Sequence, residues 1–260
     1  MILAIDIGNT NITVGGYENE KLKFISRLAT NESQTEDQYA VELYNIMRLY
    51  GAFSNGVDGG IISSVVPSVG DSMYKAVKRL LGITPLVVGP GVKTGVNIKI
   101  DNPSQLGADL VVGAVGAMSK YPMPCIIIDM GTATTLSVMD KSGAFIGGAI
   151  AAGVGLTLNA LTKNTTLLPS VSIEAPKNVI GSNTIDCMKS GIVMGTAAML
   201  DGMLDRIENE LGEKCFVVAT GGRSQEIVKH CNRDIKLDEN LLLDGLLNIY
   251  LKNSLKIKNK

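Results

Sequence analysis

The chain has 260 residues, of which 45% are hydrophobic and 19% are charged, and its formal net charge is -1. This length and composition are typical of a globular protein with one large domain or two modest ones, each able to bury a core. The lack of a basic excess argues against binding to nucleic acid or to an anionic membrane surface, and the absence of Trp argues against base-stacking surfaces.

The cysteines and the apolar segments indicate the compartment. None of the four cysteines lies in a C-x-x-C pair, which argues against a zinc site, and isolated cysteines in apolar segments are typical of a reducing environment. The segment "MILAIDIGNT" has no basic region and reaches Asp6 early, so it does not resemble a signal peptide. The uncharged run 145–162 is rich in Gly and predicts a strand, a turn and a helix, not a membrane span. We therefore expect a cytoplasmic protein.

The first half of the chain predicts a hairpin extended by a third strand and followed by alternating helices and strands. Thr35 with Gln38 three residues later predicts a capping box that opens a helix, and Gly82 predicts the end of the next helix. A further helix is expected around Asp109. The strands are expected at 2–6, 12–17, 22–30, 59–67 and 85–89.

The second half repeats the opening pattern. The segment "PCIIIDMGTATTLSVMD" again predicts a strand, a D-x-G turn and a second strand, and the run from 143 adds a third. A long helix is expected from about Asn183 to Leu211, followed by the strand of "CFVVATGG" and a Leu-rich closing helix.

The two halves are similar enough to indicate an internal duplication. Asp6 and Asp129 each end an apolar strand, and they lie 129 − 6 = 123 residues apart. The boundary is expected between Met118 and Pro124, which gives an N-terminal lobe at 1–119 and a C-terminal lobe at 120–260. We expect an α/β protein in which each lobe is a mixed sheet flanked by helices.

The two D-x-G turns are suited to binding phosphate. A strand that ends in Asp and continues into Gly places a carboxylate beside exposed backbone N–H groups, and Gly lets a phosphate approach the chain closely. The carboxylate can hold Mg²⁺ directly or through water. A single D-x-G turn is common in proteins, but two such turns in similar settings indicate a bound nucleotide phosphate chain. The first turn offers Asp6, Gly8, Asn9, Thr10 and Asn11, and the second offers Asp129, Gly131, Thr132, Thr134 and Thr135.

The segment "VVATGGRSQ" is a third candidate for the nucleotide site. A strand that ends in Thr220 and leads through Gly221 and Gly222 into a helix allows close packing of a flat ligand such as adenine. A plain strand–helix turn is the alternative interpretation.

These residues resemble those of type III pantothenate kinases, in the superfamily of acetate and sugar kinases, Hsc70 and actin. The resemblance runs from about Met1 to Leu247. It is carried by "DIGNTN", "SSVVPS", "DNPSQLGAD", "IDMGTATT", "GGAI", "GVGLTLNALTKNTTLLP", "IGSNTIDCMKSG" and "ATGG". It implies two duplicated ribonuclease H-like (actin-like) halves with an interlobe cleft. It also implies transfer of phosphate from ATP to pantothenate, which is the first step of coenzyme A biosynthesis.

The resemblance further implies cofactors, an assembly and site residues. It implies Mg²⁺, a monovalent cation such as K⁺ or NH₄⁺, and a homodimer whose pantothenate pocket uses both subunits. By this match, the residues from Asp6 to Thr13 and Thr132 would bind ATP, with Asp6 on the Mg²⁺, and Asp129 would serve the monovalent cation. The pantothenate site would include Gly107, Ala108, Asp109, Leu110 and Thr184, the last from the partner subunit.

Asp109 would be the general base of this reaction. Phosphoryl transfer passes through a loose transition state, so a weak base is sufficient when it is well positioned. Partial burial would raise the pKa of the carboxyl group and strengthen the base. The alternative is an ordinary first-turn Asp that interacts favourably with the helix dipole.

The chain departs from the family pattern at two positions that would contact pantothenate. Family members commonly have Arg where this chain has Leu110, and Tyr where it has Ile100. Either pantothenate is held differently, or the substrate is another small alcohol, or the chain is a non-catalytic nucleotide-binding regulator. Lys93, Lys99 or Lys163 could supply the missing positive charge, and we favour Lys163 because it lies in a matched motif.

Overall fold

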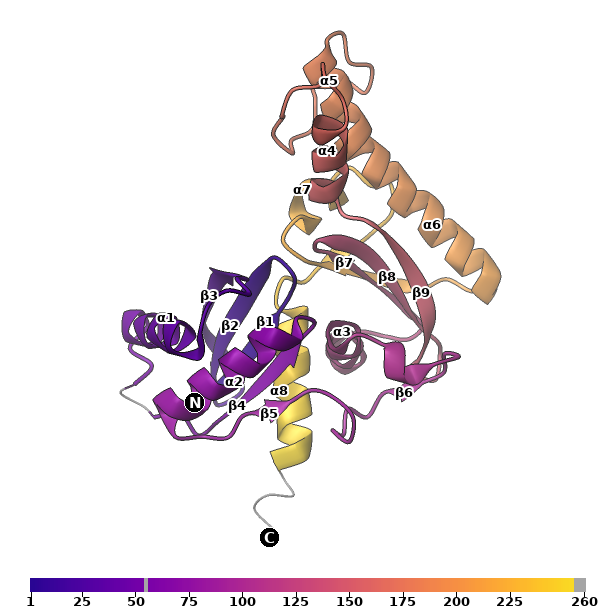
Figure 1. Ribbon diagram of the computed structural model, residues 1–260. Coiled ribbons are helices and arrows are strands. Elements are labelled where there is room, and N and C mark those ends of the chain that lie inside the picture. Colours follow the sequence, from indigo (N-terminus) through magenta and orange to yellow (C-terminus); the bar gives the residue numbers. More distant parts are fainter. Residues whose placement is uncertain (54–55, 255–260) are drawn as a thin grey trace. The chain divides into compact units, whose positions relative to one another are not determined.

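The computed structural model describes residues 1–53 and 56–254, which divide into two compact units (Figure 1). Unit 1 contains Met1–Val96, Asp101–Lys120 and the chain from Leu241 onward. Unit 2 contains Asn97–Ile100 and the remainder, from 121 to 240. Each unit is an α/β structure with its own mixed sheet, which confirms the expected fold class. The interlobe cleft stays a prediction.

These units differ from the expected lobes in two places. The short segment Asn97–Ile100 joins unit 2, and the C-terminal helix returns to unit 1. Close backbone packing explains this return. A side chain at Gly245 would begin only 2.2 Å from the carbonyl oxygen of Val112, so this glycine lets the C-terminal helix approach the helix of Asp109. The chain passes into unit 2 between Val96 and Asn97, returns to unit 1 after Ile100, and passes into unit 2 again between Lys120 and Tyr121, and the expected lobe boundary stays a prediction.

Unit 1 contains a five-stranded sheet in the order β3-β2-β1-β4-β5. Strand β1 pairs antiparallel with β2 and parallel with β4, so it lies at the centre of the sheet. The strands are β1 (Ile2–Ile7), β2 (Asn11–Glu18), β3 (Lys21–Ala29), β4 (Gly59–Ser64) and β5 (Leu86–Val87).

Helices cover both faces of this sheet. Helices α1 (Glu36–Leu49) and α2 (Pro67–Leu81) pack on one face, against β1 residues such as Leu3 and Ile5. Helices α3 (Ala108–Lys120) and α8 (Leu241–Ser254) pack on the other face, against Ala4 and Ile61 (Figure 1). The expected capping box of α1 and the glycine cap of α2 are both present.

Unit 2 contains a six-stranded sheet in the order β11-β10-β7-β8-β9-β6. Strand β7 pairs antiparallel with β8 and parallel with β10, as β1 does with β2 and β4 in unit 1. Read from the other end, strands β9-β8-β7-β10-β11 therefore repeat the order β3-β2-β1-β4-β5 of unit 1. This repeat supports the interpretation of an internal duplication. The strands are β6 (Asn97–Ile98), β7 (Cys125–Met130), β8 (Ala133–Met139), β9 (Ala144–Ala152), β10 (Phe216–Thr220) and β11 (Lys236–Leu237).

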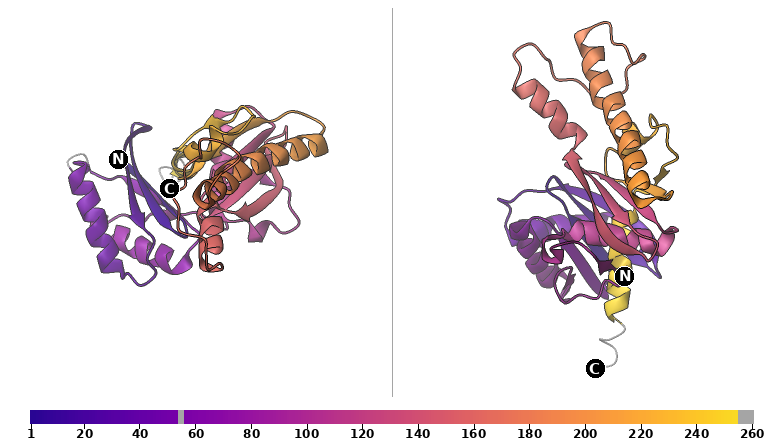
Figure 2. Two further views of the ribbon diagram at one scale, coloured as in Figure 1. Left: turned by 90° about the horizontal axis from the view of Figure 1, so that it is seen from above. Right: turned by 90° about the vertical axis from the view of Figure 1, so that its right-hand side faces the viewer.

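The helices of unit 2 gather on one face of its sheet. They bury β7 residues such as Ile126 and Ile128 in one apolar cluster. Figure 2 shows α4 and the beginning of the α5–α6 helix extending beyond this sheet. The helices are α4 (Val154–Lys163), α5 (Thr184–Lys189), α6 (Gly195–Leu211) and α7 (Ser224–Val228).

The helical region expected from about Asn183 to Leu211 is confirmed, because the chain is helical from Thr184 to Leu211. A π-helical segment, Ser190–Met194, lies between α5 and α6. The uncharged run 145–162 forms β9 and α4, as expected. Among the described residues, no helix is both long enough and apolar enough to cross a membrane.

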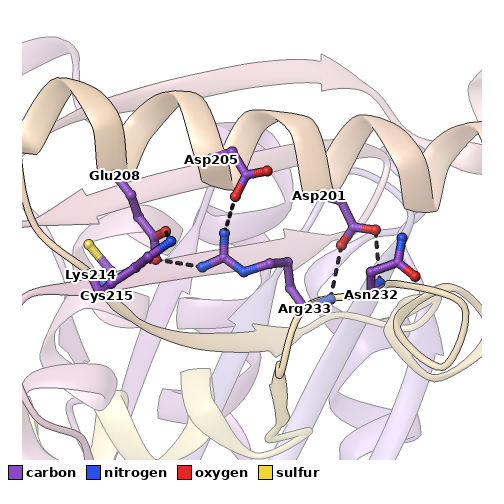
Figure 3. A network of polar contacts seen from close by, with 7 residues as sticks. All are labelled: Asp201, Asp205, Glu208, Lys214, Cys215, Asn232 and Arg233. Atoms are coloured by element: carbon purple, nitrogen blue, oxygen red, sulfur yellow. Dashed lines mark hydrogen bonds and ion pairs between the residues drawn. The ribbon is translucent and has the colours of Figure 1, made fainter.

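A network of charged side chains fastens the loop after α7 to helix α6 (Figure 3). The Glu208 side chain is only 3% exposed, and it accepts hydrogen bonds from Arg233 at 2.5 Å, Lys214 at 2.7 Å and the Cys215 N–H at 3.1 Å. Burial by itself would raise the pKa of Glu208, but these hydrogen bonds outweigh it and lower the pKa to about 2. The stabilisation is therefore present above the carboxyl group's ordinary pKa of 4.5 and is lost as the pH falls toward 2.

Replacing Arg233 with Met should destabilise unit 2 strongly, because it leaves the buried Glu208 carboxylate without its main partner. We expect a loss of about 3–5 kcal/mol in the free energy of unfolding, measured by urea denaturation at pH 7. Arg206→Met is the control, because Arg206 is exposed on the same α6 helix. Equal losses in the two variants would contradict this account of the network.

Candidate functional site

Asp6 lies in a row of three polar side chains across the sheet of unit 1. It is the fifth residue of β1, where it is directly opposite Thr13 on β2 and Ser63 on β4. Residues opposite each other on paired strands point to the same face. Since Leu3 and Ile5 face α1 and α2, the row Thr13–Asp6–Ser63 points to the face that α3 and α8 cover.

Asp129 lies in the matching row of unit 2. It is the fifth residue of β7, where it is opposite Thr135 on β8 and Thr220 on β10. This row points away from the apolar cluster that contains Ile126 and Ile128. The two D-x-G motifs thus occupy equivalent positions in two sheets of the same strand order, each with a half-buried carboxylate between two hydroxyl side chains.

The turn that follows Asp6 is closed by backbone hydrogen bonds. The Gly8 N–H donates to the Asn11 carbonyl at 3.0 Å, and the Thr30 hydroxyl donates to the Gly8 carbonyl at 2.7 Å. Asn9, Thr10 and Asn11 are exposed at this turn. These three residues are therefore open to solvent, and their binding of a phosphate chain stays a prediction.

Gly221 lies against the second D-x-G turn. Its φ is +93°, a conformation that favours glycine, and a Cβ there would be 2.5 Å from Asp129 Oδ1 and 2.6 Å from the Met130 nitrogen. The structure therefore brings the TGG turn and the Asp129 turn together within unit 2. Gly222 is exposed, with no atom within 4 Å of the position of a Cβ. Thr132 is half-buried in the same region, and its carbonyl accepts a hydrogen bond from the Gly153 N–H at 3.1 Å.

Asp109 occupies the first turn of α3, on a helix that covers the Asp6 face of the sheet in unit 1. Its Oδ1 accepts a hydrogen bond from the Leu110 N–H at 2.8 Å. Burial raises the pKa of Asp109 above its ordinary value of 3.8, although hydrogen bonds from the backbone oppose this shift. Gly107 leaves room for the carboxylate, because a Cβ there would be 2.5 Å from Asp109 Oδ1. This geometry gives a half-buried carboxylate with the raised pKa expected of a general base.

The remaining substrate candidates lie on other elements. Ala108 and Leu110 are half-buried in the first turn of α3, and Ile100 is half-buried in the segment that joins unit 2. Thr184 begins α5 and Lys163 ends α4, and both are exposed.

Two of the three lysines considered for a substrate carboxylate have other contacts. Lys99 forms an ion pair with Asp140 at 3.1 Å, so its charge is already neutralised within unit 2. The Lys93 backbone N–H and carbonyl are both held by Asn253, which fixes this segment to α8. Lys163 remains our preferred candidate because it lies in a matched motif.

The donor atoms fit a magnesium ion that is bound mainly through phosphates. Mg²⁺ commonly takes one or two carboxylates together with substrate phosphates and water. Within residues 1–53 and 56–254, no three His, Cys, Asp or Glu side chains gather as a metal-binding group. Each polar row supplies one carboxylate and hydroxyl oxygens, so a cation at Asp6 or Asp129 would need the nucleotide or water for its other ligands.

Sequence reasoning did not single out Ser63 as a member of this site. The motif "SSVVPS" contains it, but its place beside Asp6 depends on the pairing of β1 with β4, more than 50 residues away in the chain. Thr134 and Thr135 were grouped together, yet strand alternation places them on opposite faces, and only Thr135 shares the face of Asp129.

Comparison with known proteins gives a family match over most of the chain and relatives that match nearly all of it. The family profile described as "Type III pantothenate kinase" matches residues 2–206. The type III pantothenate kinase of Halalkalibacterium halodurans is 41% identical over 253 residues, covering 97% of this chain and 100% of the relative. That of Moorella thermoacetica is 38% identical over 254 residues, covering 98% and 100%.

A solved structure gives a full-length match of the fold. The structure is that of a "conserved putative Baf family transcriptional activator" from Campylobacter jejuni. Its TM-score is 0.61, with 17% identity and coverage of 97% of this chain and 98% of the other. At this identity, the match supports the fold alone.

Replacing Gly221 with Ala should destabilise the protein, because the new methyl group meets Asp129 and Met130 in a backbone conformation that favours glycine. We expect a loss of about 1–3 kcal/mol in the free energy of unfolding, measured by urea denaturation. The matched control is Gly222→Ala, which has open space and an ordinary φ. A Gly221→Ala variant as stable as Gly222→Ala would contradict the close approach of the two turns.

Proposed function

The chain belongs to the type III pantothenate kinase family, and we propose that it transfers the γ-phosphoryl group of ATP to the primary hydroxyl of pantothenate. The product is 4′-phosphopantothenate, in the first step of coenzyme A biosynthesis, and we place the reaction in the cytoplasm. The observation that carries the proposal is the pair of equivalent carboxylate rows at Asp6 and Asp129 in a chain that matches these kinases over nearly its full length.

We assign the nucleotide and the cations to the two D-x-G turns. The residues from Asp6 to Thr13 bind the phosphates, and Asp6 holds Mg²⁺ directly or through water. Thr132, Gly221 and Gly222 bind ATP. Asp129 would bind a monovalent cation, K⁺ or NH₄⁺. Bound Mg²⁺ supplies neutralisation of the phosphate charge. The exposed turn after Asp6 and the packing of Gly221 on Asp129 support these roles.

Asp109 is the proposed general base. Its carboxylate accepts the proton of the pantothenate hydroxyl as the oxygen bonds to the γ-phosphorus and the bond from that phosphorus to the β–γ bridging oxygen breaks. Burial supports this role because a raised pKa brings the carboxyl group nearer to the working pH. Gly107 supports it by leaving space for the carboxylate above the start of α3.

The rest of the pantothenate pocket is proposed from the matched motifs. Gly107, Ala108 and Leu110 line it together with Ile100. Because Leu110 and Ile100 are apolar, the carboxylate of pantothenate needs another partner, and we assign this role to Lys163.

We propose a homodimer in which Thr184 completes the partner's pocket. Unit 2 exposes large apolar side chains on α4, α5 and the segment between them, a region that extends beyond the sheet (Figure 2). Such an exposed apolar patch is typical of an interface. The exposed residues are Leu156, Leu161, Leu167, Val179, Ile180 and Ile185.

The first test is a coupled kinase assay with ATP, Mg²⁺ and pantothenate, in K⁺ or in Na⁺. We expect turnover that requires K⁺, and we expect Asp109→Asn to lower kcat by about 10²- to 10⁴-fold while ATP still binds. Asp71→Asn, an exposed change on α2, is the control. The acid limb of the kcat/KM profile should lie above pH 3.8, because the base must lose its proton and its pKa is raised.

Two other outcomes would overturn the proposal. Turnover of another small alcohol in place of pantothenate would indicate a different kinase on the same fold. No turnover with any alcohol or cation, together with normal ATP binding, would indicate a nucleotide-binding regulator.

The shared pocket can be tested by mixing two defective variants, Asp109→Asn and Thr184→Ala. If each pocket combines Asp109 of one subunit with Thr184 of the other, a mixed dimer contains one intact pocket and one doubly defective pocket. Equal mixing after subunit exchange should restore about a quarter of wild-type activity. Activity that stays at the average of the two separate variants would show that the pocket does not combine these residues from two subunits.

A further inference from the structure

Ser63 has a buried hydroxyl that the fold of unit 1 does not use. Its side chain is 0% exposed, and its Oγ has no hydrogen-bond partner among the described residues. Buried polar groups are nearly always paired with protein, water or an ion, so an orphaned hydroxyl requires an explanation. Ser63 is directly opposite Asp6 on the adjacent strand and points to the same face.

The second half of the chain also has an orphaned hydroxyl beside its carboxylate, Asp129, but on the strand that corresponds to β2. Thr135 is opposite Asp129 on the same face, and its Oγ1 is also buried without a partner among the described residues. An orphaned hydroxyl therefore lies beside a strand-end carboxylate in each unit. The two hydroxyls are not at duplicated positions, because in the shared strand order Ser63 on β4 corresponds to Thr220 on β10, and Thr135 on β8 corresponds to Thr13 on β2.

An orphaned hydroxyl alone does not identify a site, as Thr134 demonstrates. Its Oγ1 is buried and has no partner among the described residues, but it lies opposite Met130 on the other face of β8. Ser63 differs because a carboxylate is its neighbour. A hydroxyl can both donate and accept a hydrogen bond, so it can orient a water molecule that a cation beside Asp6 carries.

We propose that Ser63 is a positioning residue for the Mg²⁺–nucleotide complex, hydrogen-bonding a water that the cation at Asp6 retains. Mg²⁺ gives up its waters reluctantly and usually keeps several of them in protein sites. A hydroxyl on the strand next to Asp6 holds such a water without replacing it. This inference rests on the proposed role of Asp6 in the kinase.

The test is the affinity of the full chain for Mn²⁺, a magnetic substitute for Mg²⁺, in the presence of a non-hydrolysable ATP analogue. Water-proton relaxation measures this affinity without turnover. We expect Ser63→Ala to raise the Kd for Mn²⁺ about 10- to 100-fold and to leave metal-free nucleotide affinity unchanged. Ser63→Thr should restore the affinity, because Thr220 occupies the equivalent position of unit 2.

Two further variants separate a metal role from a packing role. Ser137→Ala is the matched control, because Ser137 is a buried strand serine of unit 2 that lies opposite Ile127 and belongs to neither carboxylate row, and it should retain wild-type affinity. Ser63→Cys keeps the buried volume but weakens hydrogen bonding, so it should lose affinity even if Ser63→Ala folds poorly.

The proposal is overturned if Ser63→Ala and Ser63→Cys bind Mn²⁺ like the wild type, or if Ser137→Ala loses as much affinity as they do. Asp6→Asn distinguishes this failure from failure of the proposed function. If Asp6→Asn weakens Mn²⁺ binding and the Ser63 variants do not, only the inference on Ser63 fails. If Asp6→Asn has no effect either, the proposed Mg²⁺ site at Asp6 fails as well.

Discussion

The position of the central strand in each sheet is the constraint on which the candidate site depends. Strand β1 is hydrogen-bonded on one side to β2 and on the other to β4, so a shift by one residue would turn Asp6 toward the apolar cluster of α1 and α2. The same argument holds for Asp129 on β7. Burial of the alternate residues, such as Ile5 and Ile128, therefore fixes where the carboxylates point. The apolar burial that stabilises each sheet therefore also sets the direction of its carboxylate side chain.

Local patterns were sufficient to predict most elements of both units. The capping box at Thr35 and the glycine cap at Gly82 depend on residues within one or two turns, and both are present. The two D-x-G turns were recognised because each follows an apolar strand. Their equivalence was inferred from spacing, and the shared strand order supports it.

Features that depend on distant parts of the chain were not predicted. The return of α8 to unit 1 depends on a glycine that allows close approach of the two helices, since Gly245 lies against the backbone carbonyl of Val112, and no local pattern reveals that contact. The π-helical segment Ser190–Met194 within the long helical region was not predicted either. Ser63 was missed because the strand register that places it beside Asp6 joins segments far apart in the sequence.

We propose that the two equivalent rows have different tasks, with Mg²⁺ at Asp6 and a monovalent cation at Asp129. The most direct measurement is calorimetric titration of a non-hydrolysable ATP analogue into the wild type, Asp6→Asn and Asp129→Asn, with and without Mg²⁺ and in K⁺ or Na⁺. The account predicts that Asp6→Asn loses the dependence on Mg²⁺ and keeps that on K⁺, and that Asp129→Asn does the reverse. Variants that lose both dependences equally would contradict it.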